Sequence, residues 1–232
     1  MGDDRTAGES SVLRVGAMCS VAAGSLTLAA AITYLAMPSA QRAAVGGAKL
    51  LPSVASGAGM LKLEFVLLAL VALFGLGLVP ALTQLVREAN EGLVRWIGTI
   101  ATVGYAVTAA SYFFALGRLP KLAAAYVAGD ESTKAALLAT WRSSLDLQGY
   151  WQFLAVGAFI VLVSLLALRL GRLPAVLCYL GLAIGLLSVL AAVGSGAAAP
   201  TFLTGVVAVA TVLAPIWYGW TGLVLWRRAA AQ

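Results

Sequence analysis

Apolar residues fill six long stretches of the chain, and segments richer in polar residues, glycine and proline separate them. Each stretch holds roughly the 20 residues that an α-helix needs to cross the hydrocarbon core of a bilayer. None alternates strictly between apolar and polar positions, as a transmembrane β-strand would. Because a helix satisfies its own backbone hydrogen bonds in lipid, we predict an all-α, six-helix membrane bundle. The predicted spans cover residues 12–37, 61–86, 94–116, 151–168, 173–193 and 202–226, in one membrane domain over residues 1–232.

Two of the connecting segments are long, at residues 38–60 and 117–150. The second opens with Gly-Arg-Leu-Pro, which indicates a helix boundary, and it contains a turn where Asp130 or Ser132 is suited to cap a helix. Apolar residues then recur at helical spacing, at Leu137, Leu138, Trp141 and Leu145. We predict a short amphipathic helix at about 132–146, which either lies on the outer membrane surface or covers the mouth of the bundle.

Basic residues predict the orientation of the chain. With the N-terminus inside, the inside segments carry Arg5, Arg14, Arg87, Arg95, Arg169, Arg172, Arg227 and Arg228. The outside segments carry Arg42, Lys49, Lys62, Arg118, Lys121, Lys134 and Arg142. The two totals are close, but the inside segments are much shorter and therefore denser in positive charge. Since short cytoplasmic loops carry this signal, we predict that both termini are cytoplasmic.

Composition narrows the class of protein further. Apolar residues make up 62% of the chain and charged residues 10%, against about 45–50% and about 25% in soluble domains. The chain has no histidine and only two cysteines, so we predict neither a metal nor a haem cofactor. The net charge of +6 comes from residues at the ends of apolar stretches. This pattern indicates contact with membrane lipid rather than nucleic acid, in a multi-pass protein of the inner (plasma) membrane of a cell.

Small residues and tryptophans indicate how the helices are arranged. Gly16, Ser20 and Gly24 form one stripe, and Gly181 and Gly185 lie on another. Such stripes let helix backbones approach closely. They serve either packing within the bundle, which we favour because a six-span monomer needs such contacts, or a partner subunit or homo-oligomer. Near the ends of spans the chain carries tryptophans, most of which we predict to lie in interfacial belts, at Trp96, Trp151, Trp217, Trp220 and Trp226.

Glu64 is the only carboxylate within a predicted span. It is either a tolerated interfacial charge or a group that faces a polar cavity. Polar residues on other spans that we group with it as a candidate ligand site are Thr102, Tyr105, Thr108, Tyr112, Gln152, Thr204, Thr211 and Tyr218. The stripes on the third and sixth spans are able to line one outward-opening cleft. Alternatively, the threonine hydroxyls bond to their own helix carbonyls and each tyrosine finds a single partner.

The C-terminal half resembles a family of small bacterial six-span membrane proteins that is labelled a domain of unknown function. The resemblance rests on Gly-Arg-Leu-Pro-Ala at 171–175, Tyr-Leu-Gly-Leu-Ala-Ile-Gly at 179–185, Ala-Pro-Ile-Trp-Tyr-Gly-Trp-Thr-Gly at 214–222 and Leu-Trp-Arg-Arg at 225–228. It implies the six-span fold and brings no known activity and no catalytic residues.

Two hypotheses for the function remain from the sequence. The first is a non-catalytic membrane protein that acts as an accessory or scaffold subunit, or binds lipid or a small hydrophobic ligand. The alternative is a small transporter or channel with an outward-facing polar cavity around Glu64. The sequence contains no paired-carboxylate signature, nucleophile elbow or phosphate-binding loop, which disfavours an enzyme.

Overall fold

The computed structural model describes residues 3–42, 47–140, 151–196 and 200–231, and within these ranges the side chains of 3–7, 9, 194–196, 200–208, 210 and 211 lie outside the description. The long helices are α1 (Asp3–Ala36), α3 (Gly59–Val86), α4 (Glu91–Ala128), α6 (Gly157–Arg169), α7 (Ala175–Gly196) and α8 (Pro200–Ala230). The short ones are η1 (Ser39–Gln41), α2 (Gly47–Ser56), η2 (Arg87–Ala89), α5 (Glu131–Thr140) and the π-helical η3 (Trp151–Val156).

Within the part of the chain that the structure describes, five helical segments are long and apolar enough to cross a membrane, which confirms the all-helical prediction and indicates a multi-pass membrane protein. They are Ser10–Ala36, Gly59–Ala89, Glu91–Ala128, Trp151–Arg169 and Ala175–Val193. The sixth predicted span lies within α8, and its place as a membrane span stays a prediction. The same holds for the single domain, for the cytoplasmic side of the termini and for the bacterial inner membrane.

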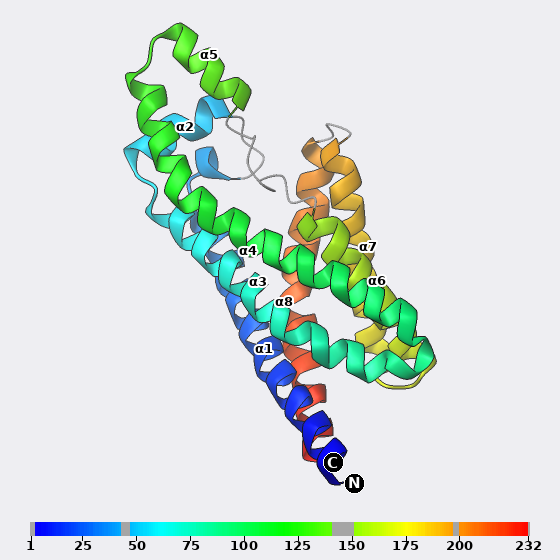
Figure 1. Ribbon diagram of the computed structural model, residues 1–232. Coiled ribbons are helices and arrows are strands. Elements are labelled where there is room, and N and C mark those ends of the chain that lie inside the picture. The colour runs from blue at the N-terminus through cyan, green and yellow to red at the C-terminus, as the bar shows by residue number, and fades with distance from the viewer. Residues whose placement is uncertain (1–2, 43–46, 141–150, 197–199, 232) are drawn as a thin grey trace.

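The helices form an elongated bundle in which the two chain ends lie together (Figure 1). α1 packs along α8 and α3, and α6 packs against α7. The Ser10 hydroxyl donates to the Ala229 carbonyl, 3.4 Å away, near the two ends of the chain. At the same end of the bundle, an ion pair between Arg172 and Glu88 joins the turn after α6 to the turn after α3. The opposite end carries α2 and α5.

Glycines allow the closest helix contacts. A Cβ added to Gly24 on α1 would lie 2.9 Å from the Gly219 backbone nitrogen on α8. A Cβ added to Gly16 would lie 2.2 Å from that of Ala81 on α3, and one on Gly185 would lie 2.7 Å from the Gly157 carbonyl oxygen on α6. Both small-residue stripes therefore pack within the chain. A homo-oligomer contact through them would have to displace these helices, and it stays a prediction.

The C-terminal part of α4 differs from the prediction, which ends the third span at residue 116 and begins a loop at 117. The helix instead continues through Pro120 to Ala128. A proline inside a helix removes one hydrogen bond and clashes with the preceding turn. Leu119 and Ala123 offset this cost, because they are buried in a small apolar cluster with α2 residues such as Leu51. Packing against α2, within the segment predicted as loop 38–60, thus keeps α4 helical.

The predicted outer helix is present as α5 (Glu131–Thr140), and Asp130 caps it. Asp130 Oδ1 accepts hydrogen bonds from the Thr133 backbone N–H at 2.8 Å and from the Ser132 hydroxyl at 3.0 Å. Of the four predicted apolar positions, Leu137 and Leu138 are half-buried, and Leu138 packs on the α2–α4 cluster. Trp141 and Leu145 lie outside the described residues. The two predicted roles, membrane-surface helix and cover over the bundle, both stay open.

Candidate functional site

Glu64 is buried inside the protein. The residue is 8% exposed, although it lies only one and a half turns from the start of α3 at Gly59. Its Oε2 atom has no hydrogen-bond partner among the residues that the structure describes. Glu64 and Gly75 are three helical turns apart, so both lie on one face of α3. The interpretation of Glu64 as a charge that reaches water at the interface does not fit this burial.

Phe65, the residue after Glu64, contacts a hydrogen-bonded pair formed by Tyr112 on α4 and Gln152 in η3. The ring of Phe65 packs on that of Tyr112, with centroids 5.6 Å apart. The Tyr112 hydroxyl in turn donates to Gln152 Oε1 at 3.0 Å. Two of the predicted site residues, Tyr112 and Gln152, are therefore brought together, at the end of the bundle where Glu64 also lies.

Tyr105 and Tyr218 form a second pair, deeper in the bundle. Their hydroxyl oxygens lie 2.8 Å apart, and both residues are buried. The ring of Tyr105 packs over Gly75, where an added Cβ would lie 2.3 Å from a ring carbon. The Ser20 hydroxyl donates to the Tyr218 carbonyl at 2.6 Å. Side chains and backbone from α1, α3, α4 and α8 thus meet at this pair, about 16 Å along α3 from Glu64.

The tyrosine pair uses only one of its two hydroxyl protons. Each hydroxyl is one donor and also an acceptor, and the single bond between them leaves one O–H without an acceptor in the described part of the chain. Tyr105 on the third span and Tyr218 on the sixth, one residue of each predicted stripe, therefore meet in a closed contact. The cleft predicted along the rest of the two stripes stays a prediction.

The threonines fit the alternative interpretation where they are described. The Thr102 hydroxyl donates to the Gly98 carbonyl at 2.9 Å, and the Thr108 hydroxyl donates to the Gly104 carbonyl at 2.7 Å. Both hydroxyls are thus occupied by their own helix. Thr204 and Thr211 lie in α8, and their side chains are outside the described residues.

A small apolar hollow lies beside the site, between α2, α3 and α4. It is lined by Val54, Ala58, Leu61, Lys62, Phe65, Ala115, Leu116, Leu119 and Pro120. Glu64 does not line it, although its neighbours on α3 do. The hollow offers contacts to apolar groups, next to the buried carboxyl group of the same helix.

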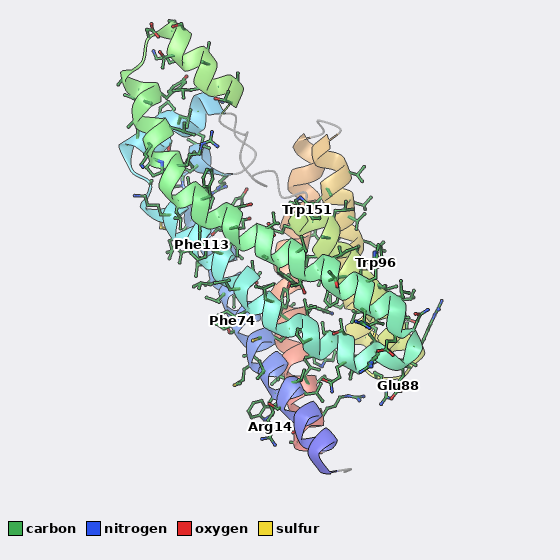
Figure 2. All side chains as sticks on the ribbon, viewed as in Figure 1. Arg14, Phe74, Glu88, Trp96, Phe113 and Trp151 are labelled. Carbon is green, nitrogen blue, oxygen red and sulfur yellow. The ribbon has the colours of Figure 1, made fainter. Side chains whose placement is uncertain are left out.

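Sequence reasoning missed one group of buried polar residues, formed by Ser164, Trp217 and Thr221. The prediction placed Trp217 in an interfacial belt, but the residue is only 1% exposed and packs edge-on against Tyr218. Trp96 and Trp151, by contrast, are well exposed on the surface of the bundle (Figure 2), and their place in an interfacial belt stays a prediction. The run of polar and aromatic residues around Trp217 is the sequence signal that points to a polar interior.

Among the described residues, no group of three His, Cys, Asp or Glu side chains is placed to hold a metal ion.

Comparison with known proteins places the chain in a family. The family model described as "Domain of unknown function (DUF4386)" matches residues 22–226, which is most of the chain and more than the C-terminal half that carries the resemblance seen in the sequence. No curated protein and no solved structure matches. The protein therefore belongs to the DUF4386 family.

Proposed function

We propose that this membrane protein binds a small amphiphilic ligand, with Glu64 as the group that receives a cationic or hydrogen-bond-donating head. The observation that carries the proposal is the burial of the Glu64 carboxyl group with one oxygen unpartnered among the described residues. An accessory or scaffold role is compatible with this activity and stays a prediction from composition.

The argument starts from the cost of a buried carboxyl group. A charge costs about 2.5–3.5 kcal/mol at the centre of a membrane helix on insertion scales and less toward the helix ends, where Glu64 lies. A buried charge without a partner is more costly still than a paired one. In the described part of the chain no cation pairs with Glu64, since the ion pairs there are Arg87–Glu91, Lys134–Glu131 and Arg172–Glu88. The carboxyl group is therefore stable when it is protonated or when a ligand supplies the missing partner.

The surroundings of Glu64 favour a ligand with an apolar tail. The apolar hollow beside it contacts Leu61 and Phe65 on the same helix. The hollow has room for about one water molecule and not for an alkyl chain, so the tail of a ligand would stay in the surrounding lipid. A ligand with an amine head would satisfy the carboxyl group, and its alkyl tail would keep it in the membrane beside α3.

The test compares a charged and an uncharged probe of equal chain length. Decylammonium and decanol are added to the protein in lipid nanodiscs, and the unfolding temperature is followed by tryptophan fluorescence. We expect decylammonium to raise the unfolding temperature of the wild type, because a ligand that binds only the folded state stabilises it. The variant Glu64→Gln, which keeps the shape of the side chain, should lose that increase.

Glu131→Gln is the matched control, because Glu131 is an exposed carboxylate at the start of α5. Its ion pair with Lys134 is at the surface, so this variant should keep the wild-type response to decylammonium. An equal response of the wild type and Glu64→Gln to decylammonium would rule out the proposed role of Glu64. So would an equal response of the wild type to both probes.

A second candidate function, proton- or cation-coupled transport, is favoured by a different observation. The buried polar residues Thr108 and Ser111 on α4 lie between Tyr112 and Tyr105 along the helix, and the Tyr105–Tyr218 pair has a hydroxyl proton to spare among the described groups. Intramembrane carboxylates often belong to ion or proton pathways. In this function Glu64 would exchange the ion, and the tyrosine pair would close the path in the state described here.

Proteoliposomes test this second candidate. A potassium gradient with valinomycin imposes a membrane potential, and a dye inside the vesicles reports proton entry. We expect flux above that of empty vesicles for the wild type and for Glu131→Gln, and a loss of that excess for Glu64→Gln. Wild-type flux no greater than that of empty vesicles would exclude proton transport under these conditions.

A further inference from the structure

Three buried polar groups on α6 and α8 have no hydrogen-bond partner in the part of the chain that the structure describes. They are Ser164 Oγ, Trp217 Nε1 and Thr221 Oγ1. Ser164 and Thr221 are 0% exposed and Trp217 is 1% exposed. These groups take no part in the proposed role of Glu64, which lies toward the other end of the bundle.

Gly181 on α7 brings two of these groups to one place. A Cβ added to Gly181 would lie 2.1 Å from Ser164 Oγ and 2.6 Å from Trp217 Nε1. Both polar atoms therefore face the same point on α7, and any larger residue at 181 would displace them. Thr221 follows Trp217 by one helical turn, so the two side chains lie on the same face of α8. Ser164 and Trp217 therefore meet where α6, α7 and α8 pack together, and Thr221 lies one turn further along the same face of α8; we call these three residues the polar cluster.

The chemistry of the cluster defines what fits it. The indole N–H of Trp217 only donates, whereas the hydroxyls of Ser164 and Thr221 both donate and accept. Leaving such a buried group unpaired costs about 1–3 kcal/mol. The cluster contains no charged side chain and is closed to the surface, so its partner is small and uncharged. It must accept from the indole and exchange hydrogen bonds with the hydroxyls.

From this geometry we propose that the cluster is an internal water-binding site. Buried water molecules in proteins make about three hydrogen bonds, typically to polar groups that are otherwise unsatisfied. A water molecule accepts from the Trp217 indole and is hydrogen-bonded by the Ser164 and Thr221 hydroxyls. In this proposal the water molecule is enclosed between α6, α7 and α8, among side chains that are otherwise apolar.

Ser188 on α7 shows the contrasting arrangement. Its hydroxyl donates to the Ile184 carbonyl of its own helix at 2.9 Å, so it needs no further partner. Ser164 and Thr221 make no such bond. A turn of the Ser164 side chain toward the indole would let its oxygen accept from the Trp217 N–H directly, and the test below distinguishes that direct bond from a water-mediated one. Ser188 therefore provides a matched control for loss of a serine hydroxyl.

The test observes the Trp217 indole proton directly. The protein is labelled with ¹⁵N-tryptophan and studied in nanodiscs, and the Trp217→Phe variant identifies the resonance by its disappearance. We expect the Trp217 N–H to show a cross-peak to water although the residue is buried. The double variant Ser164→Ala/Thr221→Val should lose that cross-peak, whereas Ser188→Ala should keep it.

Two results would overturn the proposal. One is the absence of a water cross-peak at Trp217 in the wild type, which would mean that the indole bonds directly to a protein group. The other is a cross-peak of unchanged intensity in the double variant, which would mean that the two hydroxyls do not hold the water. If the double variant does not fold, a density map of the wild type in nanodiscs decides: density within hydrogen-bond distance of Trp217 Nε1 supports the site, and its absence overturns it.

Discussion

At the scale of single residues, the Tyr105–Tyr218 contact fixes how four helices meet. The two hydroxyls are 2.8 Å apart, and the Tyr105 ring occupies the space that Gly75 leaves free. In a bilayer, hydrogen bonds between helices contribute about 0.6 kcal/mol on average and up to about 1.7 kcal/mol. A fully buried pair between tyrosines belongs toward the upper part of this range.

We expect Tyr105→Phe to lower the free energy of unfolding by about 1 kcal/mol, because it leaves the Tyr218 hydroxyl buried without a partner. The double variant Tyr105→Phe/Tyr218→Phe should lose less than the sum of the two single variants, since both ends of the bond are removed together. Reversible unfolding in mixed micelles measures these differences. Additive losses would show that the two hydroxyls do not interact.

The sequence was sufficient to identify the candidate residues but not their contacts. Glu64 stands out because it is the lone carboxylate in a span, and the tyrosine stripes follow from helical spacing. Whether Tyr105 and Tyr218 line a cleft or bond to each other depends on the distance between α4 and α8. The spacing of residues along a single helix gives no information about that distance. The prediction for Trp217 was wrong because this residue lies close in sequence to the end of the sixth predicted span, at Leu-Val-Leu-Trp 223–226. A tryptophan near the end of a span is typical of an interfacial belt.

At the scale of elements, tertiary contacts decide where helices end. The Gly-Arg-Leu-Pro run that opens the predicted loop at 117 lies inside α4, because Leu119 is buried against α2. The same four residues at 171–174 do lie at a boundary, where Gly171 adopts a positive φ of 61° and α7 begins at Ala175. Local sequence alone does not distinguish these two outcomes, because the difference comes from the packing partner.

The contact between α1 and α8 depends on Gly24. We expect Gly24→Ala to destabilise the protein by about 1–3 kcal/mol, because the new methyl group would meet backbone atoms of Gly219 and Pro215 that do not move easily. Gly219→Ala on the facing helix is the control, since a Cβ there meets nothing within 4 Å. Unfolding in mixed micelles should separate the two variants, and equal stability would contradict this account of the contact.

The start of α5 should depend on pH. The Thr133 side chain and backbone N–H and the Ser132 hydroxyl hydrogen-bond to Asp130, and they lower the pKa of its carboxyl group from 3.8 to about 2. The folded state therefore gains stability from this cap above the unfolded pKa, and loses it as the pH falls from about 4 through about 2. Hydrogen exchange at the Thr133 amide should accelerate over this range, after correction for the intrinsic rate.

Asp130→Asn provides the comparison for this pH effect. The asparagine side chain keeps an acceptor for the Thr133 N–H and does not titrate in that range. Its corrected exchange rate should stay constant as the pH falls. The same acceleration in Asp130→Asn would place the pH sensitivity elsewhere in the molecule.

At the scale of the whole molecule, the positions of the loops are consistent with the predicted polarity. The end of the bundle with both termini also carries Arg14 and Glu88 (Figure 2) and the Arg172–Glu88 ion pair. The opposite end carries α5 and its acidic start, Asp130-Glu131. Short segments rich in arginine at one end are the pattern of a cytoplasmic face. The structure fixes which segments share an end, and the sequence predicts which end faces the cytoplasm.

Cysteine labelling checks this arrangement. We expect cysteines at Gly8 and Ala231 to react with a membrane-impermeant maleimide only after the membrane is opened, and a cysteine at Ser132 to react in intact cells. Ser132 and Gly8 are exposed positions in the structure, so accessibility within the protein does not limit either reaction. Reaction of Gly8→Cys and Ser132→Cys from the same side would contradict the fold, and the reverse order would contradict only the predicted polarity.

The length of α4 has a practical consequence. Its 38 residues extend over about 57 Å, nearly twice the roughly 30 Å of the hydrocarbon core. If α4 spans the membrane as predicted, tilt accommodates only part of this excess, and we expect one end of the helix to extend beyond the lipid. There α2 braces it through the apolar cluster around Leu51 and Leu119. This end of α4 is held in place by α2 and is therefore a suitable epitope. An antibody fragment raised against it would give electron microscopy an alignment marker outside the nanodisc.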